Sequence, residues 1–357
     1  MHGSGLVQDE AVSETSVDVS TLAAQVSWPD HTAETRARAQ SGGLGKLDQL
    51  VEFLAGVQGR YPVLDLTRAR LVIFAGDHGV AGADISAQAP DATATALRAL
   101  ADGSSPVCGL AETFGAGIRA VDVSSASPGE VAGRVRIGSG RIDTEDAASR
   151  SEIEQALRLG VSIADQEVDA GADLLIAAGI GVAASTPAAV LLAVLTNTEP
   201  VKTVGRGSGI TDGMWMRKAA VIRDARLRAW PYRADPIMLL AAAGGADFAA
   251  LGGFVLRAAA RRTPVLLDGL SACAAAAVVA LAQPRVSQWL RPAQLTPEPA
   301  HAIALTKLGL LPVLDLGVSR ADGSCGLLAL PLLRAAIQLR SASAALAEVP
   351  ADLSADV

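Results

Sequence analysis

The chain is poor in the residue types that build disulfide frameworks and metal centres. Its 357 residues include three cysteines and four histidines. The cysteines, Cys108, Cys273 and Cys325, lie far apart, without a CxxC pair and without a histidine at the spacing of metal ligands. An odd and scattered set of this kind favours neither disulfides nor a zinc site, and it fits a reducing compartment. We therefore expect a cytoplasmic protein with no bound metal.

Positive charge is also scarce. The formal net charge is −7 and the sequence pI is near 5.2. Proteins that bind nucleic acids rely on clustered Lys and Arg to neutralise phosphates, so we expect no nucleic-acid partner and predict that any bound anion is small. The residues before Val26 carry four acids but neither the basic start nor the apolar segment of a secretory signal. A loose tail is predicted over residues 1–30.

Uninterrupted apolar runs long enough to span a bilayer are missing as well. The most apolar windows are residues 239–256 and 272–282; the second is too short, and the first contains Asp247 and four glycines. Both predict buried helices of a soluble protein without a membrane partner. Half of the residues are apolar, which is enough to build one large domain or two modest ones.

Short β-branched runs alternate with longer helical patterns, which is typical of an α/β fold with a parallel sheet covered by helices. The first 60 or so residues and the stretch after Pro331 are helical in pattern and are predicted to form a smaller second layer. Polar residues and glycines at the carboxyl ends of the strands are the expected ligand site. Strands are predicted at 70–75, 173–178, 201–204, 264–267 and 311–314, and helices at 151–170, 186–195, 212–228, 247–261 and 300–308.

The segment from Val201 to Ile210 is the most informative in the chain. A β-branched run leads into three alternating glycines, and Lys218 adds positive charge in the helix that follows. Glycines in such an arrangement leave backbone N–H groups free to bind an anion. The segment therefore predicts a seat for the phosphate of a small ester, built from Gly205, Arg206, Gly207, Ser208, Gly209 and Lys218.

A second glycine loop, residues 179–184, matches the GxGxxA pattern of dinucleotide-binding folds, with Glu199 twenty residues beyond its first glycine. We reject that interpretation, because Glu199 precedes the predicted strand 201–204 instead of ending the second strand of the motif. Ser185 and Thr186 are N-cap candidates with Pro187 at the first helical position, so a helix N-terminus that holds an anion is predicted here. An ordinary capped helix after a tight turn is the open alternative.

Three further positions carry candidate chemistry. Asp77 and His78 follow the strand at 70–75 and are expected to shape a turn and the rim of the site by hydrogen bonding, since a metal would need more ligands. Asp322, in the loop 315–326, is a candidate general base, although an Asp-Gly pair is also common in turns. His301, at a predicted helix start, is expected to be a structural cap.

Taken together, several segments resemble the nicotinate-nucleotide:dimethylbenzimidazole phosphoribosyltransferases of cobalamin lower-ligand assembly. They occur in the order of that family and extend from Gly42 to Ile337. The segments are Gly43–Leu47, Phe74–Val80 with Ile85–Ala87, Gly205–Asp212, Arg217–Lys218, Ala243–Asp247, Arg262–Gly269, Glu298–His301 and the loop around Asp322.

The resemblance implies a Rossmann-like parallel sheet in a large α/β domain over residues 66–330, with a small helical domain from residues 31–65 and 331–357. It also implies a homodimer that uses no cofactor and transfers phosphoribose from nicotinate mononucleotide to 5,6-dimethylbenzimidazole. Asp322 would replace the family's catalytic glutamate. The resemblance assigns Gly181, Ser185, Thr186 and Lys218 with the 205–209 loop to the phosphate and ribose, and Asp77, His78, Ser86 and Gln88 to the azole pocket.

The sequence departs from the family pattern at three places. Asp322 is one methylene shorter than glutamate. The segment from Ala178 to Thr186 lacks an acid and an amide that the family carries, and Gln88-Ala89 replaces an aromatic-proline pair. Two functions therefore stay open: an active phosphoribosyltransferase for this or a related azole, and a paralogue that binds a nucleotide or azole without turnover.

Overall fold

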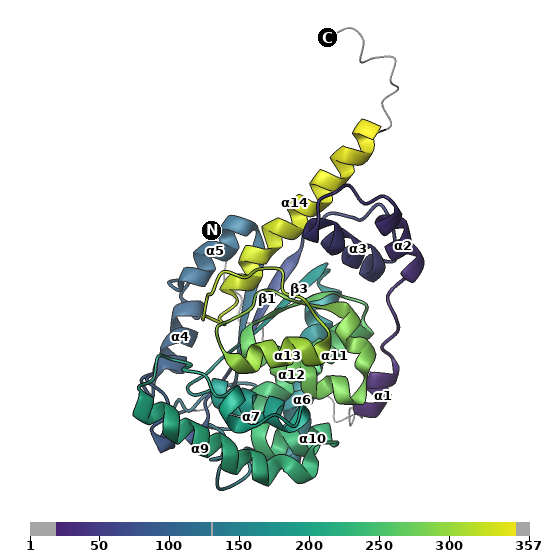
Figure 1. Ribbon diagram of the computed structural model, residues 1–357. Helices are drawn as coiled ribbons and strands as arrows, with labels where there is room; N and C mark the ends of the chain where they lie inside the picture. The colour runs from purple at the N-terminus through teal and green to yellow at the C-terminus, as the bar shows by residue number, and fades with distance from the viewer. Residues whose placement is uncertain (1–18, 130, 348–357) are drawn as a thin grey trace.

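A computed structural model describes residues 19–129 and 131–347. Within these residues, five strands form one parallel sheet in the order β2-β1-β3-β4-β5. The sheet runs through the centre of the molecule in Figure 1 and is surrounded by helices. This confirms the α/β class and the parallel sheet. The strands are β1 (Ala69–Gly76), β2 (Ala116–Ser124), β3 (Leu174–Ile180), β4 (Val265–Asp268) and β5 (Leu290–Pro292).

The helices alternate with the strands over most of the chain. The α-helices are α1 (Val19–Ala24), α2 (His31–Ala39), α3 (Lys46–Gln58), α4 (Ala92–Ala101), α5 (Pro106–Phe114), α6 (Arg150–Asp169), α7 (Ser185–Leu195), α8 (Pro200–Thr203), α9 (Asp212–Ala229), α10 (Pro236–Leu239), α11 (Ala246–Ala260), α12 (Gly269–Ala282), α13 (Pro299–Leu308) and α14 (Ser324–Ala347). Short 3-10 turns occur at Gly79–Ala83, Trp230–Tyr232 and Pro284–Trp289, and one π-helical turn at Leu240–Gly244.

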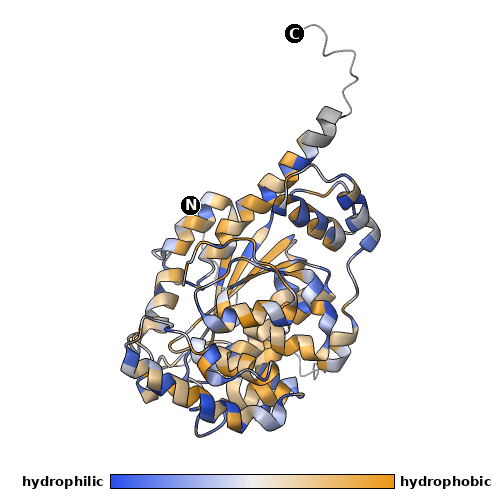
Figure 2. Cartoon of the chain, in the orientation of Figure 1, coloured by the Kyte–Doolittle hydropathy of each residue, from blue (hydrophilic) through white to orange (hydrophobic). Residues whose placement is uncertain are grey.

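The two faces of the sheet pack on different helices, as the alternation of side chains along a strand requires. In β1, the ring of Phe74 lies edge-on to Phe254 of α11, with ring centroids 5.4 Å apart. Leu71, which points to the other face, lies beside the start of α14 and is paired in register with Ile176 of β3. Strands buried on both faces have continuous apolar sequences, and they form the orange centre of Figure 2.

Outside α11, helix α6 forms a further layer that packs unusually closely. A Cβ added at Gly160 of α6 would overlap the backbone carbonyl of Ala250 in α11. The close approach of these two helices therefore depends on glycine at this position. The contact fixes α11, whose other side supports the sheet.

Helix α3 packs on α14 and helix α2 packs on α3, on the upper right of Figure 1. The buried side chain of Arg340, near the end of α14, forms an ion pair with Asp48 of α3 and donates to the carbonyl of Ala37 in α2. The small helical domain of residues 31–65 and 331–357 stays a prediction. Helix α14 begins before residue 331 and continues through Pro331. Residues 1–18 and 348–357 lie outside the described residues. Residues 19–30 belong to the folded structure, since α1 buries Leu22 and Ala23.

Helix α14 is long and apolar enough to cross a membrane by length and composition alone. Its apolar window, Ser324–Ala342, has 19 residues, and half of it is buried inside the protein. Arg334 donates to the backbone carbonyls of Leu66 and Phe114. These contacts pack α14 against the rest of the protein.

Two of the predicted strands are wrong. Residues 201–203 belong to the short helix α8 and do not join the sheet. Pro200 stands at the first position of this helix, where proline is favoured. Residues 311–314 contribute one isolated bridge from Leu314 to Gln294. The true fifth strand is β5, and β2 was not predicted.

Candidate active site

A cavity of about 540 Å³ opens at the carboxyl ends of the strands. This is the position at which open parallel α/β sheets bind ligands. The cavity collects side chains from loops that are far apart in the sequence. It is lined by Ile85, Ser86, Gln88, Gly179, Ile180, Gly181, Ala183, Ala184, Ser185, Gly207, Ser208, Gly209, Lys218, Leu270, Ser271, Thr296, Glu298, Ser319, Arg320, Ala321 and Asp322.

Most of the residues predicted for the site lie on this cavity. Those that line it are Gly181, Ser185, Gly207, Ser208, Gly209, Lys218, Ser86, Gln88 and Asp322. Those that do not are Thr186, Gly205, Arg206, Asp77 and His78. Within the described residues, no group of three His, Cys, Asp or Glu side chains is arranged to hold a metal ion.

Lys218 is a buried cation in the wall of the cavity. Its side chain comes from α9 and is 1% exposed. Its ammonium donates to Ser185 Oγ at 2.9 Å and to the carbonyl of Gly205 at 3.1 Å. Burial lowers its pKa, and the nearby Glu298 carboxylate opposes that shift. An ammonium has three N–H donors, so Lys218 keeps one for a ligand in the cavity.

Glu298 is the side chain that sequence reasoning missed at the phosphate seat. Its carboxylate accepts from the backbone N–H of Gly207 at 2.8 Å. A Cβ at Gly205 would overlap this carboxylate, which gives Gly205 a structural role without lining the cavity. The glycine loop therefore already holds one anion, and a phosphate would have to bind beside it or replace it.

Arg206 and Thr186 are not placed to bind a ligand in this cavity. Arg206 is exposed, donates to the carbonyl of Ile210, and pairs with Asp212 at 2.5 Å. Thr186 is fully buried behind the cavity wall. The predicted N-cap is also wrong: Ala184 is the N-cap of α7, which places Ser185 and Thr186 inside the first turn. Ser185 still lines the cavity, where its hydroxyl accepts from Lys218.

The segment with Ser86 and Gln88 is joined to the glycine loop. Ser208 Oγ accepts from the N–H of Ala87 at 2.8 Å and lies 3.4 Å from Ser86 Oγ. The side-chain oxygen of Gln88 accepts from the N–H of Ala183 at 3.4 Å. These bonds hold the wall predicted for the azole against the wall predicted for the phosphate.

Asp77 and His78 support the cavity from behind. Asp77 Oδ1 accepts from Thr93 Oγ1 at 2.5 Å and from the N–H of Val182 at 2.9 Å. The N–H of His78 donates to the carbonyl of Val182 at 3.3 Å. His78 Nε2 lies 3.3 Å from Asp247 Oδ2, and both side chains are buried. Neither residue lines the cavity, and both are bonded to Val182 in the loop behind it.

Asp322 lies in the cavity wall with its carboxylate fully bound by donors. Oδ2 accepts from Arg320 Nε at 3.0 Å and Nη2 at 2.7 Å. Oδ1 accepts from Ser324 Oγ at 2.6 Å and from the N–H of Ser324 at 3.2 Å. Burial raises the pKa of Asp322, but the bonds from Ser324 and the cation of Arg320 outweigh it, and the net shift lowers the pKa.

Asp268 is a second carboxylate beneath the same loop. It ends β4, is fully buried, and accepts from the N–H groups of Cys325 and Gly326 at 3.0 Å each. Burial raises its pKa to about 7, and the nearby Asp322 carboxylate acts in the same direction. Asp268 thus fastens the start of α14, two residues after Asp322, to the end of a central strand.

The elevated pKa of Asp268 predicts a specific pH dependence of stability. The folded protein holds a proton on Asp268 that the unfolded chain releases near its ordinary pKa of 3.8. Folding therefore takes up a proton between about pH 4 and pH 7, and raising the pH through this interval lowers the free energy of unfolding by at most about 1.4 kcal/mol per unit. In Asp268→Asn this contribution is absent. Urea unfolding of both proteins at several pH values measures the difference, and parallel curves would contradict the prediction.

His301 is a buried structural residue. Its Nδ1 accepts from the N–H of Thr296 at 3.0 Å, and Nε2 lies 3.2 Å from Cys273 Sγ. Burial lowers the pKa of His301 to about 4, so the ring is neutral at pH 7. It fixes the segment that carries Thr296 into the cavity wall.

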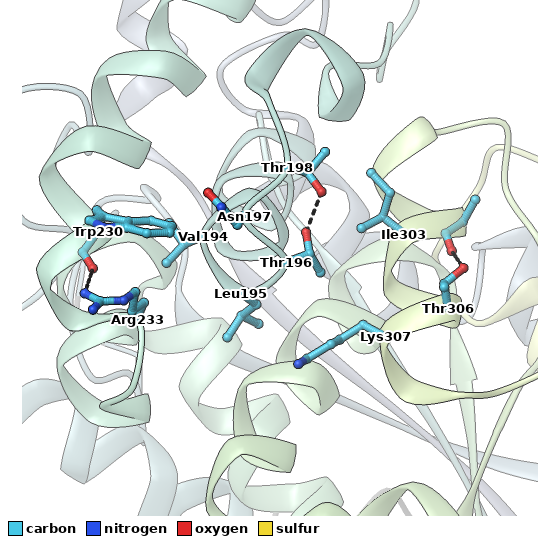
Figure 3. A pocket seen from close by; sticks show the side chains of 11 residues that line it. Val194, Leu195, Thr196, Asn197, Thr198, Trp230, Arg233, Ile303, Thr306 and Lys307 are labelled. Carbon is cyan, nitrogen blue, oxygen red and sulfur yellow. Dashed lines mark hydrogen bonds between the residues drawn. The ribbon is translucent and has the colours of Figure 1, made fainter.

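A larger cavity, of about 800 Å³, lies away from the strand ends. Figure 3 shows its walls: the end of α7 with Val194 and Leu195, Trp230 and Arg233 on one side, and Lys307 of α13 on another. Among the described residues that line this cavity there is no Asp or Glu, so its walls offer no carboxylate to accept a proton. We therefore take the smaller cavity as the candidate active site.

Most of the chain is similar to known phosphoribosyltransferases. A family model described as Phosphoribosyltransferase matches residues 28–349. The chain is 45% identical over 344 residues to the nicotinate-nucleotide–dimethylbenzimidazole phosphoribosyltransferase of Mycobacterium ulcerans (strain Agy99), covering 93% of this chain and 96% of that protein. It is 46% identical over 336 residues to the protein of the same name from Mycobacterium avium (strain 104), covering 91% and 96%. The crystal structure of CobT from Thermus thermophilus is similar with a TM-score of 0.82 and 30% identity, covering 87% of this chain and 96% of that one.

Proposed function

The chain belongs to the nicotinate-nucleotide–dimethylbenzimidazole phosphoribosyltransferase family, and we propose that it transfers phosphoribose from nicotinate mononucleotide to 5,6-dimethylbenzimidazole or a related azole. The products are nicotinate and α-ribazole 5′-phosphate. The observation that carries the proposal is one cavity that combines a glycine loop, the buried cation Lys218 and the carboxylate of Asp322. Nothing in the comparisons favours the alternative of a paralogue without turnover.

The reaction asks the protein to hold a ribose phosphate while a bond at the anomeric carbon is exchanged. Lys218 and the residues that begin α7 supply positive charge for the phosphate: the free N–H of the ammonium, and the N-terminal end of the helix dipole. Gly207, Ser208 and Gly209 supply the opposite wall. Holding the nucleotide in this way leaves the anomeric carbon to the azole.

The azole then attacks as the nicotinate leaves. A nitrogen lone pair of the azole bonds to the anomeric carbon, and the electron pair of the old bond goes to the nitrogen of nicotinate. The azole N–H becomes acidic as this bond forms, and Asp322 accepts the proton. Ser86 and Gln88 line the azole side of the cavity, and Asp77 and His78 hold the loop at Val182 behind it.

The direct test is incubation of the purified protein with nicotinate mononucleotide and dimethylbenzimidazole, followed by chromatography. Release of nicotinate only in the presence of the azole is the expected result. Saturable binding of the nucleotide without nicotinate release would overturn the proposed activity. The same assay with a series of substituted azoles identifies the acceptor, since Gln88-Ala89 makes this side of the cavity more polar than the family pattern.

Two properties complete the proposal. The enzyme is proposed to be a homodimer, as the family resemblance implies, and to act in the cytoplasm, in keeping with its free cysteines. Light scattering at several protein concentrations measures the first property, and cell fractionation measures the second.

A further inference from the structure

The carboxylate of Asp322 has no acceptor position left for a substrate. A carboxylate offers about four lone-pair positions. Two N–H groups of Arg320 occupy Oδ2, and the hydroxyl and N–H of Ser324 occupy Oδ1. Before Asp322 accepts the proton of an azole, at least one of these donors has to leave.

Arg320 is the donor best placed to leave. Its side chain is 61% exposed, whereas that of Asp322 is 19% exposed. Ser324 begins α14, and the N–H groups of the next two residues are fastened to the buried Asp268. The Ser324 bonds are therefore part of the fixed framework, and the Arg320 bonds join the carboxylate to a long, exposed side chain on the cavity wall.

A second anion in the cavity would draw the guanidinium away. The nucleotide of the proposed reaction carries two anionic groups: the phosphate, for which Lys218 is available, and the carboxylate on the nicotinate ring. Arginine binds a planar carboxylate through two parallel N–H bonds, and Arg320 is the cavity-lining cation besides Lys218.

Resting on the proposed function, we propose that Arg320 binds the ring carboxylate of nicotinate mononucleotide and thereby releases Asp322 to accept the azole proton. Arg320 exchanges one carboxylate for another, so no net charge moves. The azole proton goes to the freed Oδ2 of Asp322 as the carbon–nitrogen bond forms, and the departing nicotinate takes the electron pair of the bond that breaks. Arg320 is thus a specificity-determining and positioning residue.

The test compares nicotinate mononucleotide with nicotinamide mononucleotide, which has a neutral amide in place of the carboxylate. Calorimetry measures the Kd of each nucleotide, independently of turnover. In the parent protein the carboxylate form is expected to bind at least about tenfold more tightly. In Arg320→Gln that preference is expected to fall to near one, through weaker binding of the carboxylate form alone. Arg320→Lys keeps the charge but lacks the two parallel N–H donors of the guanidinium, and it is expected to recover part of the preference.

Turnover gives a second readout that a purely structural role would not change. With the amide nucleotide, the parent keeps Asp322 bound to Arg320, so kcat is low. In Arg320→Gln the carboxylate is free, and kcat with the amide nucleotide is expected to rise several-fold. The acid limb of the pH profile is expected to move to higher pH, because Arg320→Gln removes the cation that lowers the pKa of Asp322. The titratable groups that still face Asp322 are then the buried Asp268 and Cys325.

Arg223→Gln is the matched control, since Arg223 pairs with Asp224 in an exposed Arg–Asp contact on α9 away from the cavity. It is expected to match the parent in both readouts. Equal losses of affinity for the two nucleotides in Arg320→Gln, or an unchanged preference, would overturn the inference. The proposed function fails separately, if the parent binds nucleotide but releases no nicotinate with any azole.

Discussion

Asp322→Asn is expected to lower kcat by about 10³-fold while the Kd of nicotinate mononucleotide stays the same or falls, because Arg320 no longer pairs with a carboxylate of the protein. Proton transfer to a positioned group contributes roughly 10²- to 10⁴-fold to a rate, and asparagine has no basic oxygen to receive the proton. The new amide side chain is the same size as the carboxylate and keeps an oxygen for the N–H of Ser324, so the loop should keep its shape. Rapid-quench measurement of nicotinate release with saturating nucleotide and azole gives kcat, and calorimetry gives Kd.

Asp322→Glu is the matched comparison. It restores the length of the side chain that the family resemblance places here, and it is expected to preserve or raise kcat. A loss of nucleotide affinity equal to the loss of kcat in Asp322→Asn would indicate a damaged loop. Full activity of Asp322→Asn would remove Asp322 from the role of base.

Lys218→Ala is expected to raise the Kd of nicotinate mononucleotide by about 100-fold. Removing one partner of a buried charge pair costs roughly 2–5 kcal/mol, and about 1.4 kcal/mol corresponds to a tenfold change in affinity. The variant loses the ammonium proposed to bind the phosphate, and it leaves the Glu298 carboxylate on Gly207 without a neighbouring cation. Both changes disfavour a second anion in the seat.

The phosphate-free nucleoside provides the control ligand, because its binding should change far less than that of the mononucleotide. Lys202→Ala provides the control variant, since Lys202 is exposed and pairs with Glu199 on the surface. Circular dichroism checks that Lys218→Ala is folded. Equal losses of affinity for nucleotide and nucleoside would place Lys218 outside the phosphate site.

The central strands could be predicted from the sequence, whereas the edges of the sheet could not. β1, β3 and β4 are buried on both faces and therefore appear as continuous apolar runs. β2, at one edge, is interrupted by Gly117, Arg119 and Asp122, and β5, at the other edge, has three residues. The apolar stretches at 201–204 and 311–314 were mistaken for strands, because a run of four residues is too short to distinguish a strand from a helical turn or a loop.

The site could be predicted where its residues are local and not where they meet through the fold. The glycines at 207 and 209 and the polar residues Ser185 and Asp322 were predicted from loop composition, and all four line the cavity. The role of Glu298 depends on a bond to Gly207, 91 residues away, and no spacing rule connects the two. The bonds of Arg206 to Ile210 and Asp212 could not be predicted either, because an arginine beside glycines is equally typical of a ligand site and of a surface ion pair.

Helix α14 joins two parts of the molecule that otherwise have separate tasks. Its first turn follows the loop of Asp322, and Arg340, sixteen residues after Ser324, is anchored among the N-terminal helices. At about 1.5 Å per residue these points are roughly 24 Å apart along one continuous helix. A tilt of this helix at its far end would therefore also displace Asp322, the proposed proton acceptor, where a displacement of about 1 Å can cost 100-fold in rate. The packing of α2 and α3 on α14 thus helps to position the Asp322 carboxylate, although neither helix contacts it.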